Sequence, residues 1–576
     1  MPISRVLNHA VRLLLATSLH HGLSLGSALN PGFVYQNNIS PDFIGGVASE
    51  AIECSTIGRD LLARGGNAVD ALVGTTFCVG VIGMYHSGIG GGGFVLVRDA
   101  KGNYEAIDFR ESAPAAAFQD MYQGNIAGSV YGGLSAGVPS EVRGLEYTHK
   151  KYGSLPWDVV MEGAIRVARD GFKVSEDFVR YCNRATSDGP GFLVDDPVWA
   201  EDFAPNGKLL EVGETMTRKR YAKTLETIAR YGADAFYTGK IAESMIAIIQ
   251  ETNGTMTLDD LRDYQVISRD VAKVSYRGVD LHGISAPAGG AVCLSILKTM
   301  EQYDLEDWQD VDLTTHRLVE SMRFAYSARL QLGDPSFVDH MNSFQSQMIS
   351  DKNARDIRNR ILDNQTLPVT EYDPLKIYTT DSHGTSHIST ADRSGMATSL
   401  TTTVNLLFGA QIMDPETGVI INNEMNDFSI PGVRNEFGFE PSEANFVRPN
   451  KRPLSSITPV IASLPDGTLL ATVGGAAGGS RIISSTALAL WHTLEHGMSL
   501  TEAIGEPRLH DQLMPNHVLV EYAFDNSTVD GLVERGHNIK YVAPGLSAVQ
   551  GVWRHGDGVF EAASEPRQKN SGGVTA

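Results

Sequence analysis

The sequence GTSHISTADRSGMATSLTTTVN, residues 384–405, predicts a β-hairpin, because it consists of two strand-like runs joined by a tight turn. The turn residues DRSG at 392–395 separate two runs rich in β-branched and hydroxyl-bearing residues. If Ala391 lies opposite Ala397, then Thr385 lies opposite Thr403. Because the turn type is open, a register shifted by one residue is the alternative. By itself, Thr385 would be an ordinary strand threonine.

Helical and strand patterns alternate on both sides of this hairpin. Residues 48–82 predict two helices, the first stopped by Gly65-Gly66 and the second capped by Asn67. Residues 154–252 and 258–332 predict helices with loops, and residues 481–497 predict another helix. Strands are expected at 94–99, 104–111, 459–464 and 468–475 and near 517–522, 548–553 and 557–562. This mixture favours an α+β or layered αββα fold with antiparallel sheets.

Amino-acid composition and net charge argue against some classes of function. The 576 residues are 42% hydrophobic, enough for a large core, and 47 Lys+Arg against 68 Asp+Glu give a formal charge of −21. Bulk charge therefore argues against binding nucleic acid or an anionic membrane surface. Downstream of the N-terminus, the sequence contains no long apolar run that would predict a spanning helix, so a membrane anchor is not expected.

The N-terminus has the pattern of a short signal peptide. Arg5 and Arg12 precede an apolar run at 13–19, and small residues follow at 26–28, so residues 1–30 are expected to be a leader. The alternative is an irregular cytosolic N-terminus. Sequons at Asn38, Asn253, Asn364 and Asn526 are compatible with a secreted or vacuolar glycoprotein.

Four cysteines, Cys54, Cys78, Cys182 and Cys293, have no CxxC spacing, so no metal site is expected. Cys54 and Cys78 lie in one apolar helical region and could pair in a secreted chain, and four buried thiols are the alternative.

A glycine loop, HSGIGGGG at 86–93, satisfies G-x-G-x-x-G through Gly88, Gly90 and Gly93. A dinucleotide fingerprint follows a strand and opens a helix, whereas here a helix precedes the loop and a strand follows it. The loop therefore predicts close backbone packing or a pocket lined by N–H groups, and not a nucleotide site.

Five motifs together overturn the ordinary interpretation of Thr385. They are DFRESAP at 108–114, GTSHIS at 384–389, NNEMNDF at 422–428, PNKRPLSS at 449–456 and GGSRI at 478–482. In this order and spacing the chain, from about residue 40 to its end, closely resembles the γ-glutamyltranspeptidases. That family has an N-terminal-nucleophile hydrolase fold with a layered αββα core.

The resemblance implies self-cleavage between Gly384 and Thr385, giving a large subunit, 31–384, and a small subunit, 385–576, that form a heterodimer. Cleavage frees the α-amino group of Thr385, whose reference pKa of about 7.7–8.0 suits a base for the weakly nucleophilic hydroxyl. No cofactor is implied.

The resemblance also assigns the pocket. Arg110, Ser455 and Ser456 would hold the substrate α-carboxylate, since a guanidinium fork suits that group. Asn405, Glu424 and Asp427 would accept from the α-ammonium. The ordinary alternatives are a solvated charge or a structural ion pair for Arg110, a loop turn for the two serines and a solvated acidic loop for the carboxylates.

Backbone N–H groups of Gly478 and Gly479 would form the oxyanion hole, and Thr403 would hydrogen-bond the nucleophile. Secreted animal members carry a disulfide like Cys54–Cys78. In two departures, Phe437 stands where bacterial members have a lid tyrosine, and Ser386 stands where many members have a second threonine.

The implied activity is transfer of the γ-glutamyl group of glutathione and related compounds to water or to an amino-acid or dipeptide acceptor. One rival is an acylase on the same fold that removes glutaryl groups, which carry no ammonium. The other is a catalytically dead homologue that only binds.

Overall fold

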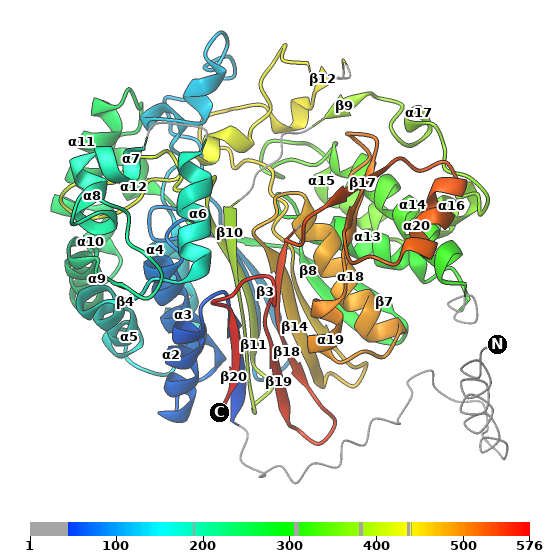
Figure 1. Cartoon of the computed structure of the whole chain (residues 1–576), viewed down its shortest axis with the longest axis horizontal. Coiled ribbons are helices and arrows are strands. Elements are labelled where there is room, and N and C mark those ends of the chain that lie inside the picture. Colours follow the sequence, from blue (N-terminus) through cyan, green and yellow to red (C-terminus); the bar gives the residue numbers. More distant parts are fainter. Residues whose placement is uncertain are drawn as a thin grey trace, which may run out of the picture. The chain divides into compact units, whose positions relative to one another are not determined.

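Two β-sheets stacked face to face form the centre of the computed structural model (Figure 1). The structure describes residues 44–187, 191–304, 310–378, 384–434, 438, 440–545 and 547–576. The expected leader, Asn38 and Phe437 lie outside the described residues. Within the described residues, no helix is long and apolar enough to cross a membrane.

The first sheet has seven strands in the order β20-β1-β10-β11-β2-β3-β6. Their bounds are β20 Gly572–Thr575, β1 Gly45–Ser49, β10 Gly384–Asp392, β11 Ala397–Asn405, β2 Gly92–Arg98, β3 Tyr104–Phe109 and β6 Ile267–Arg269. All neighbours in this sheet are antiparallel. The hairpin at 384–405 therefore lies in the middle of the sheet, where both of its strands are buried over their whole length.

The second sheet has six strands in the order β19-β18-β14-β13-β8-β7. Their bounds are β19 Phe560–Ala563, β18 Ala548–Arg554, β14 Leu469–Ala476, β13 Pro459–Ser463, β8 Val279–Ile284 and β7 Val271–Tyr276. A core that includes Phe94, Leu96, Ile461 and Val552 fills the space between the two sheets. Burying such side chains on both inner faces holds the sandwich together.

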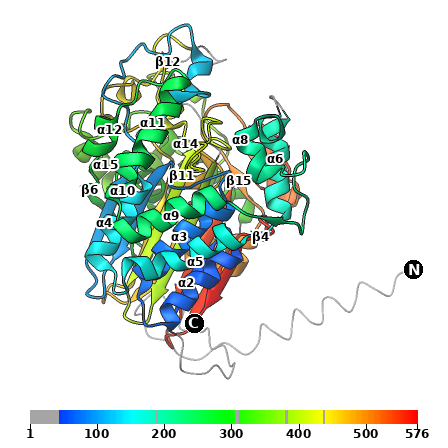
Figure 2. The same ribbon diagram turned by 90° about the vertical axis from the view of Figure 1, so that its left-hand side faces the viewer.

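Helices cover both outer faces. On the first sheet, α2 Ile52–Ala63, α3 Ala68–Ile82, α4 Glu141–Tyr152, α5 Trp157–Asp170 and α9 Lys219–Tyr231 share one apolar core with the strands (Figure 2). On the second sheet, α13 Gly290–Met300, α14 Val311–Arg329, α18 Arg481–Glu495 and α19 Leu500–Gly505 share another. The layers are αββα, which confirms the expected α+β class.

The remaining helices of at least six residues are α6 Glu176–Thr186, α8 Pro197–Phe203, α11 Gly239–Glu251, α12 Leu258–Asp263, α15 Met341–Met348, α16 Asp351–Arg360 and α20 Asn526–Glu534. A small third sheet pairs β15 Leu509–His510, β16 Val518–Glu521 and β17 Ile539–Val542. Isolated pairs join β4 Phe172–Lys173 to β5 Thr215–Met216 and β9 Ile377–Tyr378 to β12 Glu440–Pro441.

Two local expectations need correction. Residues 48–49 belong to β1, and the first helix begins only at Ile52. The region 258–332, expected to be helices with loops, contains β6, β7 and β8 before α13. In β7 the side chains of VAKVSY alternate between more and less buried positions, which is the two-residue period of a strand.

The expected disulfide is present. Cys54 on α2 and Cys78 on α3 are bonded, with a sulfur–sulfur distance of 2.01 Å, and they join two helices that pack side by side. Cys182 and Cys293 are free and buried. The alternative of four unpaired thiols is therefore wrong.

Candidate active site

Thr385 lies at the start of β10, at one end of the central hairpin. The pairing of Ala391 with Ala397 is as expected and continues to Ser386 with Thr402. The register then shifts, so that Gly384 pairs with Asn405, and Thr385 of β10 faces two residues of β11, Thr403 and Val404, as in a β-bulge. Bulges commonly re-aim a side chain beside an active site. The alternative of a whole register shifted by one residue is therefore wrong, but the pairing is interrupted at the residue of interest.

The Thr385 hydroxyl is held by the second sheet. The backbone N–H of Ala477, just after β14, donates to Thr385 Oγ1 at 2.7 Å. The same N–H lies 3.1 Å from the Thr385 carbonyl oxygen. Thr385 is 5% exposed. Its oxygen is therefore oriented by a backbone donor and not by its own rotamer preference alone.

Thr403 contacts the peptide group that precedes Thr385. Its hydroxyl donates to the carbonyl oxygen of Gly384, and its Oγ1 accepts the N–H of Asn405 at 2.7 Å. The resemblance implies instead a hydrogen bond from Thr403 to the nucleophile. In this uncut chain the bulge places the Gly384 carbonyl against Thr403, so the contact is made on the other side of the Gly384–Thr385 bond.

Gly478 and Gly479 follow Ala477 and lead into α18. Their carbonyl oxygens accept from Arg481 at 3.1 Å and from Ile482 at 3.0 Å, as in the first turn of a helix. Gly479 has φ +56°, a conformation that glycine adopts without strain. Because N–H groups at a helix N-terminus point away from the helix, this segment favours negative charge beside Thr385.

Arg110 is the centre of a buried charge cluster at the end of β3. Its guanidinium forms ion pairs with Glu424 through Nη1 and with Asp427 through Nη2. Both carboxylates belong to one 3₁₀ turn, Glu424–Asp427. Arg110 is 1% exposed, and its backbone N–H donates to Asp108 Oδ1 at 2.8 Å. The structure thus brings together the motifs at 108–114 and 422–428.

The cluster contains more acid than base. Burial by itself would lower the pKa of Arg110, but the carboxylates of Glu424 and Asp427 raise it above its usual value. Burial raises the pKa of Glu424 and of Asp427, and burial raises the pKa of Glu111 to about 7. Three buried carboxyl groups lie around the Arg110 guanidinium, and the guanidinium of Arg329 also favours the charged form of Asp427, so three acids face two bases. A bound ammonium group would add a positive charge to this acid-rich cluster.

Asn405 links this cluster to Thr385. Its backbone pairs with Gly384, and its side-chain Nδ2 donates to the carbonyl of Asn423 at 3.0 Å, one residue before Glu424. Asn405 has φ +74°, and its Oδ1 is buried without a hydrogen-bond partner among the described residues. An amide oxygen in that state can accept from a bound ammonium group.

Ser455 and Ser456 lie on the loop that passes the Arg110 side chain. Arg110 Nε and Nη2 approach the carbonyls of Pro453 and Leu454, each at 3.5 Å. The Ser455 hydroxyl accepts the N–H of Ile457 at 3.1 Å, which leaves its proton free to donate elsewhere.

Two site residues were missed by sequence reasoning. Arg329, from the end of α14, donates to Ser456 Oγ at 2.8 Å, and Glu111 lies beside Arg110. Glu111 adjoins Arg110 in its motif, so it could have been found. Arg329 has no such signal, because it reaches the pocket from a helix distant in sequence.

The glycine loop packs tightly, as expected. A Cβ on Gly90 would lie 1.9 Å from the Ile420 carbonyl oxygen, and one on Gly91 would lie 1.9 Å from that of Thr403. Such contacts exclude any side chain at these positions. The loop therefore supports the strand that carries Thr403.

Comparisons with known proteins show the family of the chain. A family model described as Gamma-glutamyltranspeptidase matches residues 54–575. A glutathione hydrolase proenzyme from Arthroderma benhamiae is 51% identical over 548 residues, which cover 92% of each chain.

Two solved structures are similar in fold. Cephalosporin acylase from Bacillus halodurans superposes with a TM-score of 0.80 at 25% identity, covering 96% of this chain and 99% of that one. A γ-glutamyltranspeptidase from Helicobacter pylori has a TM-score of 0.54 at 32% identity, covering 58% and 95%. Because acylase and transpeptidase structures share this fold, the fold by itself does not separate the two activities.

Proposed function

The chain belongs to the γ-glutamyltranspeptidase family, and we propose that it cleaves γ-glutamyl amides such as glutathione through an acyl intermediate on Thr385. Its αββα fold is that of the N-terminal-nucleophile hydrolases. The acyl group passes to water or to an amino acid or dipeptide. The observation that carries this proposal is the buried cluster of Arg110 with Glu424 and Asp427.

The cluster suits a zwitterionic substrate because each charged group of the substrate can take the place of a group of the same kind in an existing ion pair. The substrate α-carboxylate replaces the acidic partners of Arg110, and the α-ammonium then pairs with the carboxylates that have been released. Ser455 and Ser456 donate to the carboxylate, and Asn405 accepts from the ammonium. The exchange keeps every buried charge paired, which avoids the cost of an isolated ion.

Activation begins with the chain's own peptide bond. The Thr385 hydroxyl attacks the carbonyl carbon of Gly384, and the hydroxyl proton passes to the departing amide nitrogen. The resulting ester is hydrolysed, which leaves a carboxylate on Gly384 and a free amine on Thr385. The two products of this step are a large subunit that ends at Gly384 and a small subunit at 385–576, which remain together as a heterodimer. Separate removal of the leader at 1–30 would leave the large subunit as residues 31–384.

The freed amine then serves as the base for substrate turnover. It takes the proton of the Thr385 hydroxyl as the oxygen attacks the γ-carbonyl, and this proton is passed to the leaving amine. N–H groups of Gly478 and Gly479 at the start of α18 hold the oxyanion. Water or an acceptor amine finally releases the glutamyl group.

The rival acylase activity makes a different demand on the pocket. A glutaryl group has a carboxylate for Arg110 but no ammonium for Glu424, Asp427 and Glu111. It would bring no positive charge to these three acids beyond the guanidiniums of Arg110 and Arg329. The surplus of buried carboxyl groups therefore favours an amino-acid substrate.

The test compares γ-glutamyl-p-nitroanilide with glutaryl-p-nitroanilide on the purified full chain. We expect kcat/KM for the γ-glutamyl compound to be at least about 100-fold higher, the scale of about 2.7 kcal/mol for lost charge pairing. Equal rates, or a preference for the glutaryl compound, would favour the acylase. No turnover of either compound by a cleaved chain would indicate a binding protein.

A further inference from the structure

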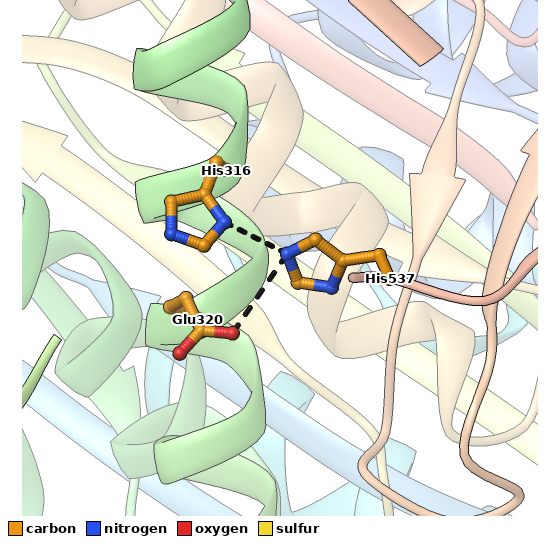
Figure 3. A group of neighbouring side chains, drawn as sticks. All are labelled: His316, Glu320 and His537. Atoms are coloured by element: carbon orange, nitrogen blue, oxygen red, sulfur yellow. Dashed lines mark hydrogen bonds and ion pairs between the residues drawn. The ribbon is translucent and has the colours of Figure 1, made fainter. Parts of the chain in front are cut away.

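A second buried cluster lies away from Thr385, at the contact of α14 with the segment after α20. His316 and Glu320 lie one turn apart on α14, and His537 faces both from the loop before β17 (Figure 3). His316 Nδ1 lies 2.8 Å from His537 Nε2, and His537 Nε2 lies 3.8 Å from Glu320 Oε1. The exposed fractions are 0%, 0% and 4% for His316, Glu320 and His537.

Two of the three side chains, His316 and Glu320, are oriented by outer partners. His316 Nε2 lies 2.8 Å from the carbonyl oxygen of Leu362. Because a carbonyl can only accept, Nε2 carries the ring proton and Nδ1 directs a lone pair towards His537. Glu320 accepts from the hydroxyls of Thr366, at 2.7 Å, and of Tyr372. Carbonyl and hydroxyl contacts of this kind orient the ligands of protein metal sites.

We propose that His316, Glu320 and His537 bind one divalent ion of the zinc type. Two imidazole nitrogens and a carboxylate are a ligand set that zinc takes in proteins, with a further position for water. The three ligand atoms lie within 4.8 Å of one another. Tetrahedral zinc with ligands at about 2.1 Å needs donor atoms about 3.4 Å apart. The observed separations lie on both sides of that value, so movements below 1 Å accommodate the ion.

Protons balance in this step. Without the ion, the proton between the two rings must come from His537 Nε2, because His316 Nδ1 is bare. When the metal binds, His537 Nε2 loses its proton and its lone pair becomes a metal ligand. The ring takes up a proton on Nδ1, so it changes tautomer and its charge stays the same. His537 Nδ1 has no hydrogen-bond partner among the described residues. Both rings stay neutral, which is the form of histidine that binds metals.

The ion would join parts of the chain that are remote in sequence. His316 and His537 are 221 residues apart, on opposite sides of Thr385. Leu362, Thr366 and Tyr372 belong to the segment that leads to the Gly384–Thr385 bond. After the proposed cleavage, on which this part of the inference rests, one ion would hold the two subunits together close to the C-terminal end of the large subunit. Zinc binding itself does not depend on cleavage or on activity.

The test uses the full chain produced without a histidine tag. We expect about one equivalent of zinc by elemental analysis, and a rise in Tm when Zn²⁺ is returned to chelator-treated protein. Bound Co²⁺ should show the visible absorption of a site with low coordination number. Glu320→Gln and His537→Gln should each weaken Zn²⁺ binding at least about 100-fold.

The matched control is His492→Gln. His492 Nδ1 lies 3.1 Å from His496 Nδ1, but this pair belongs to no group of three metal-binding side chains among the described residues. The control should keep the zinc. Absence of bound zinc in the wild type, or zinc retained in both ligand variants, would overturn the proposal. Should either variant not fold, the zinc content and the Zn²⁺-dependent Tm of the wild type decide by themselves.

Discussion

The hydroxyl of Thr403 donates a hydrogen bond to the carbonyl oxygen of Gly384, the carbonyl that Thr385 must attack for the chain to cut itself. The N–H of Asn405 occupies a lone pair of the Thr403 oxygen, so its proton is directed at Gly384. As negative charge develops on the Gly384 oxygen, this bond strengthens. Thr403 is therefore placed to assist maturation, in addition to any role in turnover.

Replacing Thr403 by valine keeps the shape of the side chain and removes the donor. We expect Thr403→Val to slow self-cleavage by about 100-fold or more, the scale for loss of one oxyanion donor. Conversion of the single chain to two bands on a denaturing gel measures it. Thr398→Val is the control, because Thr398 lies on the same strand but its hydroxyl is hydrogen-bonded to Thr390 and not to Gly384. Equal slowing in both variants would assign the effect to folding.

The hairpin at 384–405 shows which features of strand pairing could be predicted from the sequence. Alternation and turn residues predicted the register correctly from Ala391 to Ser386. The bulge at Thr385 was not predictable, because it depends on tertiary contacts such as Ala477 with the Thr385 hydroxyl and on the left-handed backbone of Asn405. The local sequence pattern predicts the register of the paired strands. The position at which the register is interrupted depends on contacts with the neighbouring sheet.

The sequence predicted which residues form the substrate site, but it did not predict which of them form ion pairs with one another. The motifs named Arg110, Glu424 and Asp427, yet their direct pairing in the substrate-free chain follows only from three-dimensional packing. The His316–His537 contact shows the same limit. A helix face can be read from the spacing of His316 and Glu320, but the partner across the fold cannot.

Asp427→Asn tests the division of charges in the pocket. The amide can still accept a hydrogen bond but carries no negative charge for the substrate ammonium, so kcat/KM for γ-glutamyl-p-nitroanilide should fall at least tenfold, or about 1.4 kcal/mol. The glutaryl analogue has no ammonium and should lose much less. Comparing the two losses in one enzyme preparation removes differences in folding and cleavage. Losses of equal size would contradict the pairing of Asp427 with the ammonium.

Glu141 gives the fold a dependence on pH. It is fully buried and accepts from the Thr402 hydroxyl, and burial raises its pKa to about 8. The folded state therefore holds a proton that the unfolded state releases above about 4.3, so this group costs stability increasingly as the pH rises towards 8. Glu141→Gln cannot ionise. The Tm of the variant relative to wild type should therefore rise between pH 5 and pH 9.

Glu521→Gln is the control for that series. The pKa of Glu521, which pairs with Arg567, is lowered from its usual value, although burial alone would raise it. Glu521 is thus ionised in both states from pH 5 upwards, and the Tm difference of its variant should stay level. A level difference for Glu141→Gln as well would mean that its carboxyl is not held neutral.

We expect the chain to become an enzyme by cutting itself immediately before Thr385. Intact-mass analysis with N-terminal sequencing of the purified protein tests this directly, alongside Thr385→Ala. The wild type should yield two chains, the smaller spanning residues 385–576 with Thr385 as its first residue, and Thr385→Ala should stay uncut and inactive. A wild-type protein that turns over γ-glutamyl substrate as one uncut chain, or a Thr385→Ala variant cut at the same bond, would contradict the account.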